Sequence, residues 1–250
     1  MNFPIIIYSM DKTFVFYCIL FILVGEFILA TVMNYLNAMR FKDPIPNDLN
    51  DVYNAEEYEK SQAYKLSNYK FGIVTSIFSL ALILGFLFFG GFSWVDEVAS
   101  NFTDNIIAQA LVFFGIIMLG SDILNIPFSY YQTFVIEEKF GFNKTSHKTF
   151  LIDKLKQWAM TIIIGGGILS LVIWFFQWAG TNFWLYTWAL ITIFTLLMNL
   201  FYSKLIVPLF NKQEPLAAGS LKEKIEHYAA NVGFELQHIF VINGSKRSTK

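Results

Sequence analysis

Two carboxylates lie within long apolar stretches of the sequence, where a charge is costly. Glu26 interrupts the stretch 13–33, and Asp122 interrupts the stretch 106–126. A carboxylate that faces lipid is strongly disfavoured, so both side chains are expected to face the interior of a helix bundle or a water-filled cavity. In such a place they could line a polar chamber or relay a proton. We favour the chamber.

Amides and hydroxyls extend this intramembrane polarity. Asn125 follows Asp122 by three residues, so the two share one helix face. Thr195 and Asn199 belong to a similar polar stripe in the stretch 183–203. All are candidates for chamber-lining residues. Hydrogen bonding between helices explains the amides and the hydroxyl equally well, so both interpretations stay open for them.

The sequence contains no recognisable complete active site. Its histidines are His147, His227 and His238, and no two are four residues apart, so the His-Glu-x-x-His zinc helix is absent. Cys18 is the only cysteine and is interpreted as a buried structural residue. Residues 165–167 are three glycines within an apolar stretch, where close helix packing explains them better than nucleotide binding.

Composition identifies the setting of these residues as a membrane. Hydrophobic residues make up 55% of the 250 residues and charged residues only 15%, against roughly 25% charged in soluble proteins. The net charge is −1, so no basic field points to nucleic acid. With one cysteine, a disulfide scaffold is excluded as well.

Five apolar stretches are long enough to cross a bilayer, which takes about 20 residues of helix. They are residues 13–33, 71–92, 106–126, 158–178 and 183–203. The runs are continuous and do not alternate, which disfavours a β-barrel. A signal peptide is the alternative for the first stretch, but Glu26 interrupts it and no small-x-small cleavage site follows closely. We therefore predict an all-α polytopic membrane protein with five transmembrane helices.

The connecting loops predict the orientation. Loops 34–70 and 127–157 each hold five lysines or arginines, loops 93–105 and 179–182 hold none, and seven follow residue 203. Since positive loops stay in the cytoplasm, the N-terminus is expected outside, and both long loops and the C-terminal tail inside.

The cytoplasmic parts carry local structural signals. Residues 53–70 are expected to form a charged helix that leads into the second span. Thr145 or Ser146 is expected to cap a further helix. On that helix Lys148, Lys154 and Lys156 would face water.

The tail begins like a soluble α+β domain. Pro208 ends the last span, residues 220–223 form a capping box, and Gly233 ends the helix that follows. Residues 239–242 are a predicted strand, and Asn243-Gly244 is a hairpin signal after which the sequence soon stops. Such a piece cannot bury a core alone. We therefore expect a transmembrane domain over 1–210 and an incomplete second domain over 211–250.

Four segments together resemble one known family. They are YEKSQAY (58–64), SYYQTFVIEEKFGFNKTS (129–146), PLFNKQEPLAAGSLKEKI (208–225) and VINGSKRSTK (241–250). In this order and spacing they resemble the type I CAAX prenyl proteases, integral-membrane zinc metallopeptidases of the endoplasmic reticulum and bacterial inner membranes.

The resemblance implies a helical barrel around a water-filled chamber. A cytoplasmic domain would cap it and hold zinc through a His-Glu-x-x-His helix. The chain would correspond to the N-terminal five-helix region and the start of the cytoplasmic metallopeptidase domain. Lacking the zinc motif, it is predicted to bind no zinc and to be inactive alone. Glu137 and Glu138 match the family's cytoplasmic loop, expected beneath the catalytic domain, although a solvated charged loop explains them equally well. Arg247 is a candidate beside the substrate strand, and the alternative for it is a surface charge on the hairpin.

The implied partners are the lipid bilayer, the remaining catalytic domain, and a peptide or protein substrate with or without a prenylated C-terminus. Two other functions remain as alternatives. One is a non-catalytic five-helix scaffold that binds lipid or peptide. The other is a proton-coupled carrier using Glu26 and Asp122, which the absence of an internal repeat disfavours. The unfinished hairpin favours the protease over the scaffold.

Overall fold

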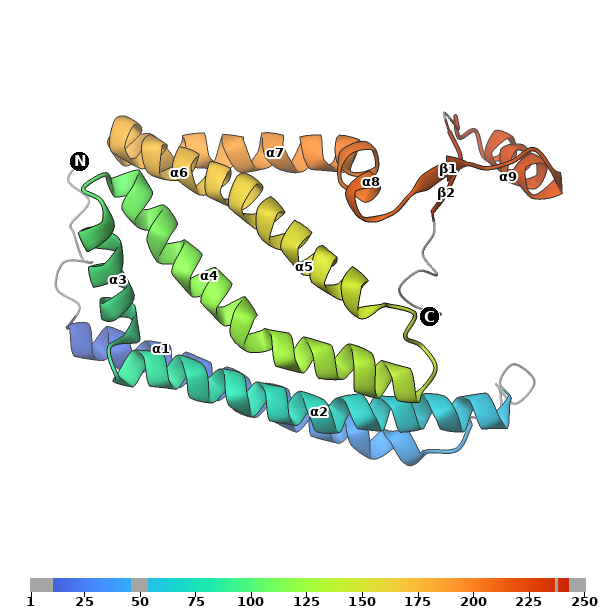
Figure 1. Ribbon diagram of the computed structural model, residues 1–250, viewed down its shortest axis with the longest axis horizontal. Helices are drawn as coiled ribbons and strands as arrows, with labels where there is room; N and C mark the ends of the chain where they lie inside the picture. The colour runs from blue at the N-terminus through green and yellow to red at the C-terminus, as the bar shows by residue number, and fades with distance from the viewer. Residues whose placement is uncertain (1–10, 46–53, 237, 243–250) are drawn as a thin grey trace. The chain divides into compact units, whose positions relative to one another are not determined.

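The computed structural model describes residues 11–45, 54–236 and 238–242, and helices dominate it (Figure 1). The longer helices are α1 (Lys12–Met39), α2 (Ala55–Phe88), α3 (Gly91–Phe102), α4 (Ile106–Tyr131), α5 (His147–Met160), α6 (Gly166–Ala179), α7 (Phe183–Leu205) and α9 (Ser220–Asn231). The short elements are the 3-10 turns η2 (Arg40–Lys42) and η6 (Gly180–Asn182), the π-helical turns η4 (Gln132–Glu137) and η5 (Thr161–Gly165), helix α8 (Val207–Phe210), and strands β1 (Gln213–Pro215) and β2 (Phe240–Ile242).

Four helical stretches of the described chain are long and apolar enough to cross a membrane. They are Lys12–Lys42, Ala55–Phe88, Ile106–Glu137 and His147–Leu205. The last one has 59 residues, enough for two spans of about 20 residues each. It is interrupted at Gly180, where φ is 53°, a backbone conformation that only glycine adopts without strain. The four stretches are therefore long enough for the five predicted spans, because His147–Leu205 can hold two of them.

Little of the described chain is buried within the protein itself. Its buried hydrophobic residues are Val95, Ala99, Ile136, Phe140 and Ala229. By contrast, Phe21 on α1 is 79% exposed and Leu200 on α7 is 68% exposed. Apolar helix faces of this extent need a nonaqueous environment, so these helices belong in a bilayer.

The chain divides into two compact units, Met1–Glu97 with Ile126–Phe140, and Val98–Asn125 with Gly141–Lys250. In the first unit α1 and α2 pack side by side (Figure 1). Aromatic and polar contacts join α2 to the segment 126–140. Phe71 stacks on Tyr131 with ring centroids 5.0 Å apart, and Gln132 Nε2 donates to Asn68 Oδ1 at 2.6 Å.

In the second unit α6 and α7 pack together after the turn at Gly180. Phe176 meets Phe183 across this turn at 5.2 Å between ring centroids. At the other end of α7, Lys156 Nζ donates to the Leu209 carbonyl oxygen at 2.6 Å. This bond attaches α5 to α8.

Three local predictions are confirmed and one loop is different. Helix α2 begins at Ala55, within the expected helical segment 53–70. Ser146 caps α5 by accepting a hydrogen bond from the Thr149 N–H at 3.1 Å. The helix of the last span, α7, ends before Pro208. The segment 93–105, predicted as a loop, is largely the helix α3, in which Val95 is fully buried. This helix was not predicted because its 12 residues are too few and too polar to form a membrane span.

The C-terminal segment confirms Gly233 and the strand, but not the capping box. Gly233 has a φ of 70° and follows α9, and Phe234 N–H donates to the Ala229 carbonyl oxygen at 2.9 Å. The N-cap of α9 is Gly219, without a side-chain capping bond. Ser220 is therefore the first helical residue, and the predicted box was wrong.

Strand β2 has a partner that the sequence did not indicate. It pairs antiparallel with β1, with Gln213 opposite Ile242. Asn243-Gly244, predicted as a hairpin turn, lies outside the described residues. Beside this strand pair, an exposed Lys212 hydrogen bonds Glu214 at 2.6 Å, which raises the pKa of the Lys212 ammonium and lowers the pKa of the Glu214 carboxyl.

Candidate functional site

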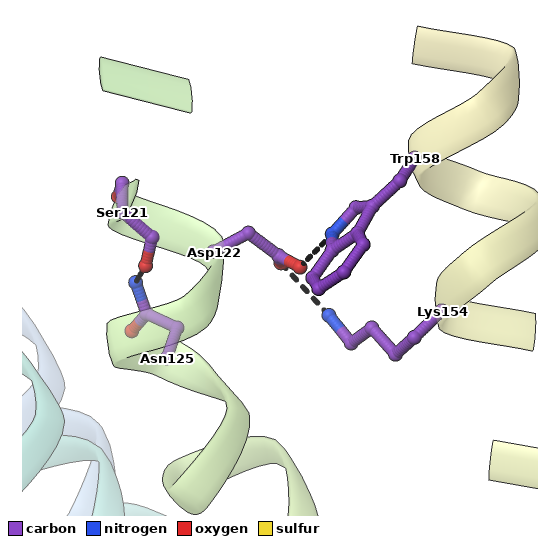
Figure 2. A network of polar contacts seen from close by, with 5 residues as sticks. All are labelled: Ser121, Asp122, Asn125, Lys154 and Trp158. Carbon is purple, nitrogen blue, oxygen red and sulfur yellow. Dashed lines mark hydrogen bonds and ion pairs between the residues drawn. The ribbon is translucent and has the colours of Figure 1, made fainter. Parts of the chain in front are cut away.

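Asp122 lies at the centre of a polar cluster between α4 and α5 in the second unit (Figure 2). Lys154 Nζ donates to Asp122 Oδ1 at 2.8 Å. Trp158 Nε1 donates to Asp122 Oδ2 at 2.6 Å. The two donors are four residues apart, so they lie on the same face of α5 and reach one carboxylate. Each carboxylate oxygen thus accepts one short hydrogen bond.

The side chains of the ion pair are only slightly exposed. The Lys154 side chain is 15% exposed and the Asp122 side chain 24% exposed. An ion pair in such a place is stable only when hydrogen bonds also satisfy its polar atoms, and the Trp158 indole supplies one. The cluster is formally neutral, so it leaves no net charge within the helices.

Lys154 and Trp158 are the functional candidates that sequence reasoning missed. Lys154 was expected to face water with the other lysines of its helix, but it turns toward Asp122 instead. A carboxylate inside an apolar helix is stabilised by a positively charged hydrogen-bond donor. The Lys154/Trp158 spacing of four residues was the signal that could have found both.

The intramembrane amides bond to their own helices. Asn125 Nδ2 donates to the Ser121 carbonyl oxygen at 2.8 Å, one turn before it and beside Asp122 (Figure 2). Asn199 Nδ2 likewise donates to the Thr195 carbonyl oxygen at 2.9 Å. Both Thr195 and Asn199 lie at exposed positions of α7. Each of these bonds pairs an amide N–H with a backbone carbonyl oxygen of the same helix.

The remaining predicted site residues do not belong to this cluster within the described part of the chain. Glu26 is at an exposed position of α1 and belongs to the first unit, whereas Asp122 belongs to the second. Arg247 lies outside the described residues. Glu137 ends η4, and Glu138 follows it at an exposed position.

The glycine triplet, which the sequence assigned to close helix packing, is not tightly enclosed. A Cβ at Gly166 would lie 3.6 Å from Leu111 Cδ2 on α4, whereas one at Gly167 would meet nothing within 4 Å. A distance of 3.6 Å is an ordinary van der Waals contact, so a Cβ would fit at Gly166 and close helix packing does not require the glycine. Gly165 closes the π-helical turn η5.

A metal site is not assembled by the residues that the structure describes. Among them, no three His, Cys, Asp or Glu side chains lie close enough together to hold an ion. The described residues do not fit zinc, so no zinc-dependent step is assigned to them.

Comparison with known proteins gives the family. Residues 34–212 match the family model described as CAAX prenyl protease N-terminal, five membrane helices. The CAAX prenyl protease 1 homolog of Arabidopsis thaliana is 35% identical over 231 residues, which are 89% of this chain and 54% of the plant protein. CAAX prenyl protease 1 of Saccharomyces cerevisiae is 32% identical, over 90% of this chain and 52% of the yeast protein.

A solved structure agrees with this match. The crystal structure of S. mikatae Ste24p superposes with a TM-score of 0.84 and 34% identity, covering 90% of this chain and 54% of that one. The chain thus spans about half the length of the curated relatives it matches. The family match covers more than half of the chain and includes both helices that build the Asp122 cluster. The chain belongs to the CAAX prenyl protease family.

Proposed function

We propose that this chain is the membrane region of a zinc metalloendopeptidase that processes CAAX-box proteins. The observation that carries the proposal is the match of residues 34–212 to the five-helix family region. The relatives with this region are named CAAX prenyl proteases. In the proposed enzyme these helices hold the substrate at the membrane, and a cytoplasmic catalytic portion carries the His-Glu-x-x-His helix and the zinc ion.

We further propose that the intramembrane polar residues line a water-filled chamber in which the substrate is held. These residues are Glu26, Asp122, Asn125, Thr195 and Asn199. Polar side chains on apolar helices support this role, because hydrocarbon disfavours them and a wet cavity does not. Residues 211–250 would begin the catalytic portion, with Arg247 beside the strand that pairs with the substrate.

Cleavage by the complete gene product tests this function. The reading frame that contains residues 1–250 is expressed with whatever follows the codon for Lys250, in a host without its own CAAX protease. Its membranes are incubated with a farnesylated CAAX peptide and with the same peptide lacking the farnesyl group. Release of the C-terminal tripeptide, lost with 1,10-phenanthroline and restored by zinc, is expected. A folded product without cleavage of either peptide would instead support the non-catalytic scaffold.

The orientation is also a proposal, because it rests on the distribution of lysine and arginine. In a Cys18→Ala background, single cysteines are placed at Lys42 and Lys144 in the long loops and at Asn101 and Thr181 in the short ones. A membrane-impermeant maleimide added to intact cells is expected to label the cysteines at Asn101 and Thr181. Those at Lys42 and Lys144 should react only after the membrane is permeabilised. The opposite labelling pattern would show that the orientation is the reverse of the proposed one, and the family assignment would be unaffected.

A further inference from the structure

A basic pocket lies in the first unit, between α2 and the segment formed by the end of α4 and η4. Its volume is about 580 Å³. Two lysines, Lys70 and Lys139, contribute to its lining together with Phe71, Val74 and Val135. The pocket therefore combines two positive charges with an apolar wall.

Among the described residues, neither ammonium group has a carboxylate partner. None of the ion pairs found in the described part of the chain includes Lys70 or Lys139. Lys139 Nζ instead lies 5.6 Å from the centroid of the Phe140 ring. Glu137 and Glu138 precede Lys139 in the chain, but neither lines the pocket, and both have interactions of their own. None of the described residues that line the pocket is acidic, so the two lysines would attract an anion bound there.

Both lysines lie where an apolar stretch meets a charged one. Lys70 directly precedes the uncharged stretch 71–92, and Lys139 closely follows the uncharged stretch 126–136. Such junctions lie at the depth of the lipid headgroups, where basic pockets between membrane helices bind anionic ones. Val74 follows Lys70 by four residues and Val135 precedes Lys139 by four, so each valine is on the apolar side of its junction.

We propose that this pocket binds an anionic phospholipid, with Lys70 and Lys139 holding its phosphate and the valine wall contacting its acyl chain. Inorganic phosphate is also negatively charged, but it has no acyl chain. The apolar wall favours the lipid, because inorganic phosphate gains nothing from contact with it. The site is independent of proteolysis and requires no residue of the Asp122 cluster.

Lipid binding to the purified full chain tests the proposal. Native mass spectrometry in detergent counts adducts of phosphatidic acid and, separately, of phosphatidylcholine with the same acyl chains. Wild-type protein is expected to prefer phosphatidic acid. Lys70→Gln and Lys139→Gln should each weaken that binding about fivefold, and the double variant about thirtyfold. Both lysines are at exposed positions, so these variants should fold, which an unchanged melting temperature verifies.

The matched control removes two lysines of the same loops that do not line this pocket. Lys65→Gln with Lys144→Gln changes the net charge equally and should change binding by less than about twofold if charge alone has little effect. Equal losses in the two double variants would overturn the proposal, because the attraction would then be a property of the whole surface. Displacement of phosphatidic acid by millimolar inorganic phosphate would also overturn it, in favour of a free-phosphate site. Unchanged binding in Lys70→Gln/Lys139→Gln would place the lipid elsewhere.

Discussion

Asp122→Asn is expected to destabilise the protein by about 2–3 kcal/mol, seen as a lower melting temperature in detergent. The substitution keeps the shape of the side chain but removes its charge, so the Lys154 ammonium, 15% exposed, loses its counterion. Breaking a fully buried pair in this way costs roughly 3–5 kcal/mol. The expected value is smaller because Asp122 itself keeps some exposure, at 24%. The amide oxygen can still accept from Trp158.

A double-mutant cycle separates the ion pair from other effects of the substitution. Asp122→Asn, Lys154→Gln and the double variant are compared with wild type by thermal unfolding. Because the double variant leaves no unpaired charge, it should be more stable than the sum of the single effects predicts, by at least about 1 kcal/mol. Lys148→Gln, at an exposed position of the same helix, is the control and should stay within about 0.5 kcal/mol of wild type. Strictly additive effects would show that the contact contributes no coupling energy, leaving Asp122 as a chamber-lining residue at most.

The helices were predictable because hydropathy and capping are local properties of the sequence. The stretch 13–33 lies within α1 and 183–203 within α7, since a long apolar run has the helix as its one stable state in a bilayer. Ser146 and Gly233 were found for the same reason, because a cap depends on its nearest neighbours. The box at Ser220 failed when Gly219 took the cap position instead.

The contacts between distant segments were not predictable in this way. Asp122 was identified from its charge alone, but its partners Lys154 and Trp158 lie on a later helix, and Lys154 was assigned to water. The pairing of β2 with β1 likewise joins segments on either side of α9. Side-chain type restricts which partners are possible, and only the packing of helices selects among them.

The turn between α2 and α3 depends on two adjacent glycines, of which Gly91 has no room for a side chain. Gly90 supplies a φ of 71° at the turn, a left-handed conformation that favours glycine. A Cβ added at Gly91 would lie 2.6 Å from Phe86 Cδ1, 2.7 Å from Phe86 Cγ and 3.0 Å from Phe86 Cα. The ring can rotate away, but the Cα belongs to the backbone of α2. Even one methyl group therefore forces the turn to open.

Gly91→Ala is accordingly expected to cost about 1–3 kcal/mol, the usual range for an extra methyl group in a closely packed place. Gly85→Ala is the matched control, because it makes the same chemical change within α2 where no atom lies within 4 Å of the new Cβ. In a helix this change is neutral or stabilising by up to about 1 kcal/mol. Thermal unfolding followed by tryptophan fluorescence should thus show a lower melting temperature for Gly91→Ala and an unchanged or higher one for Gly85→Ala. Equal melting temperatures for Gly91→Ala and wild type would mean that α3 shifts freely, and Gly91 would then have no part in fixing the turn.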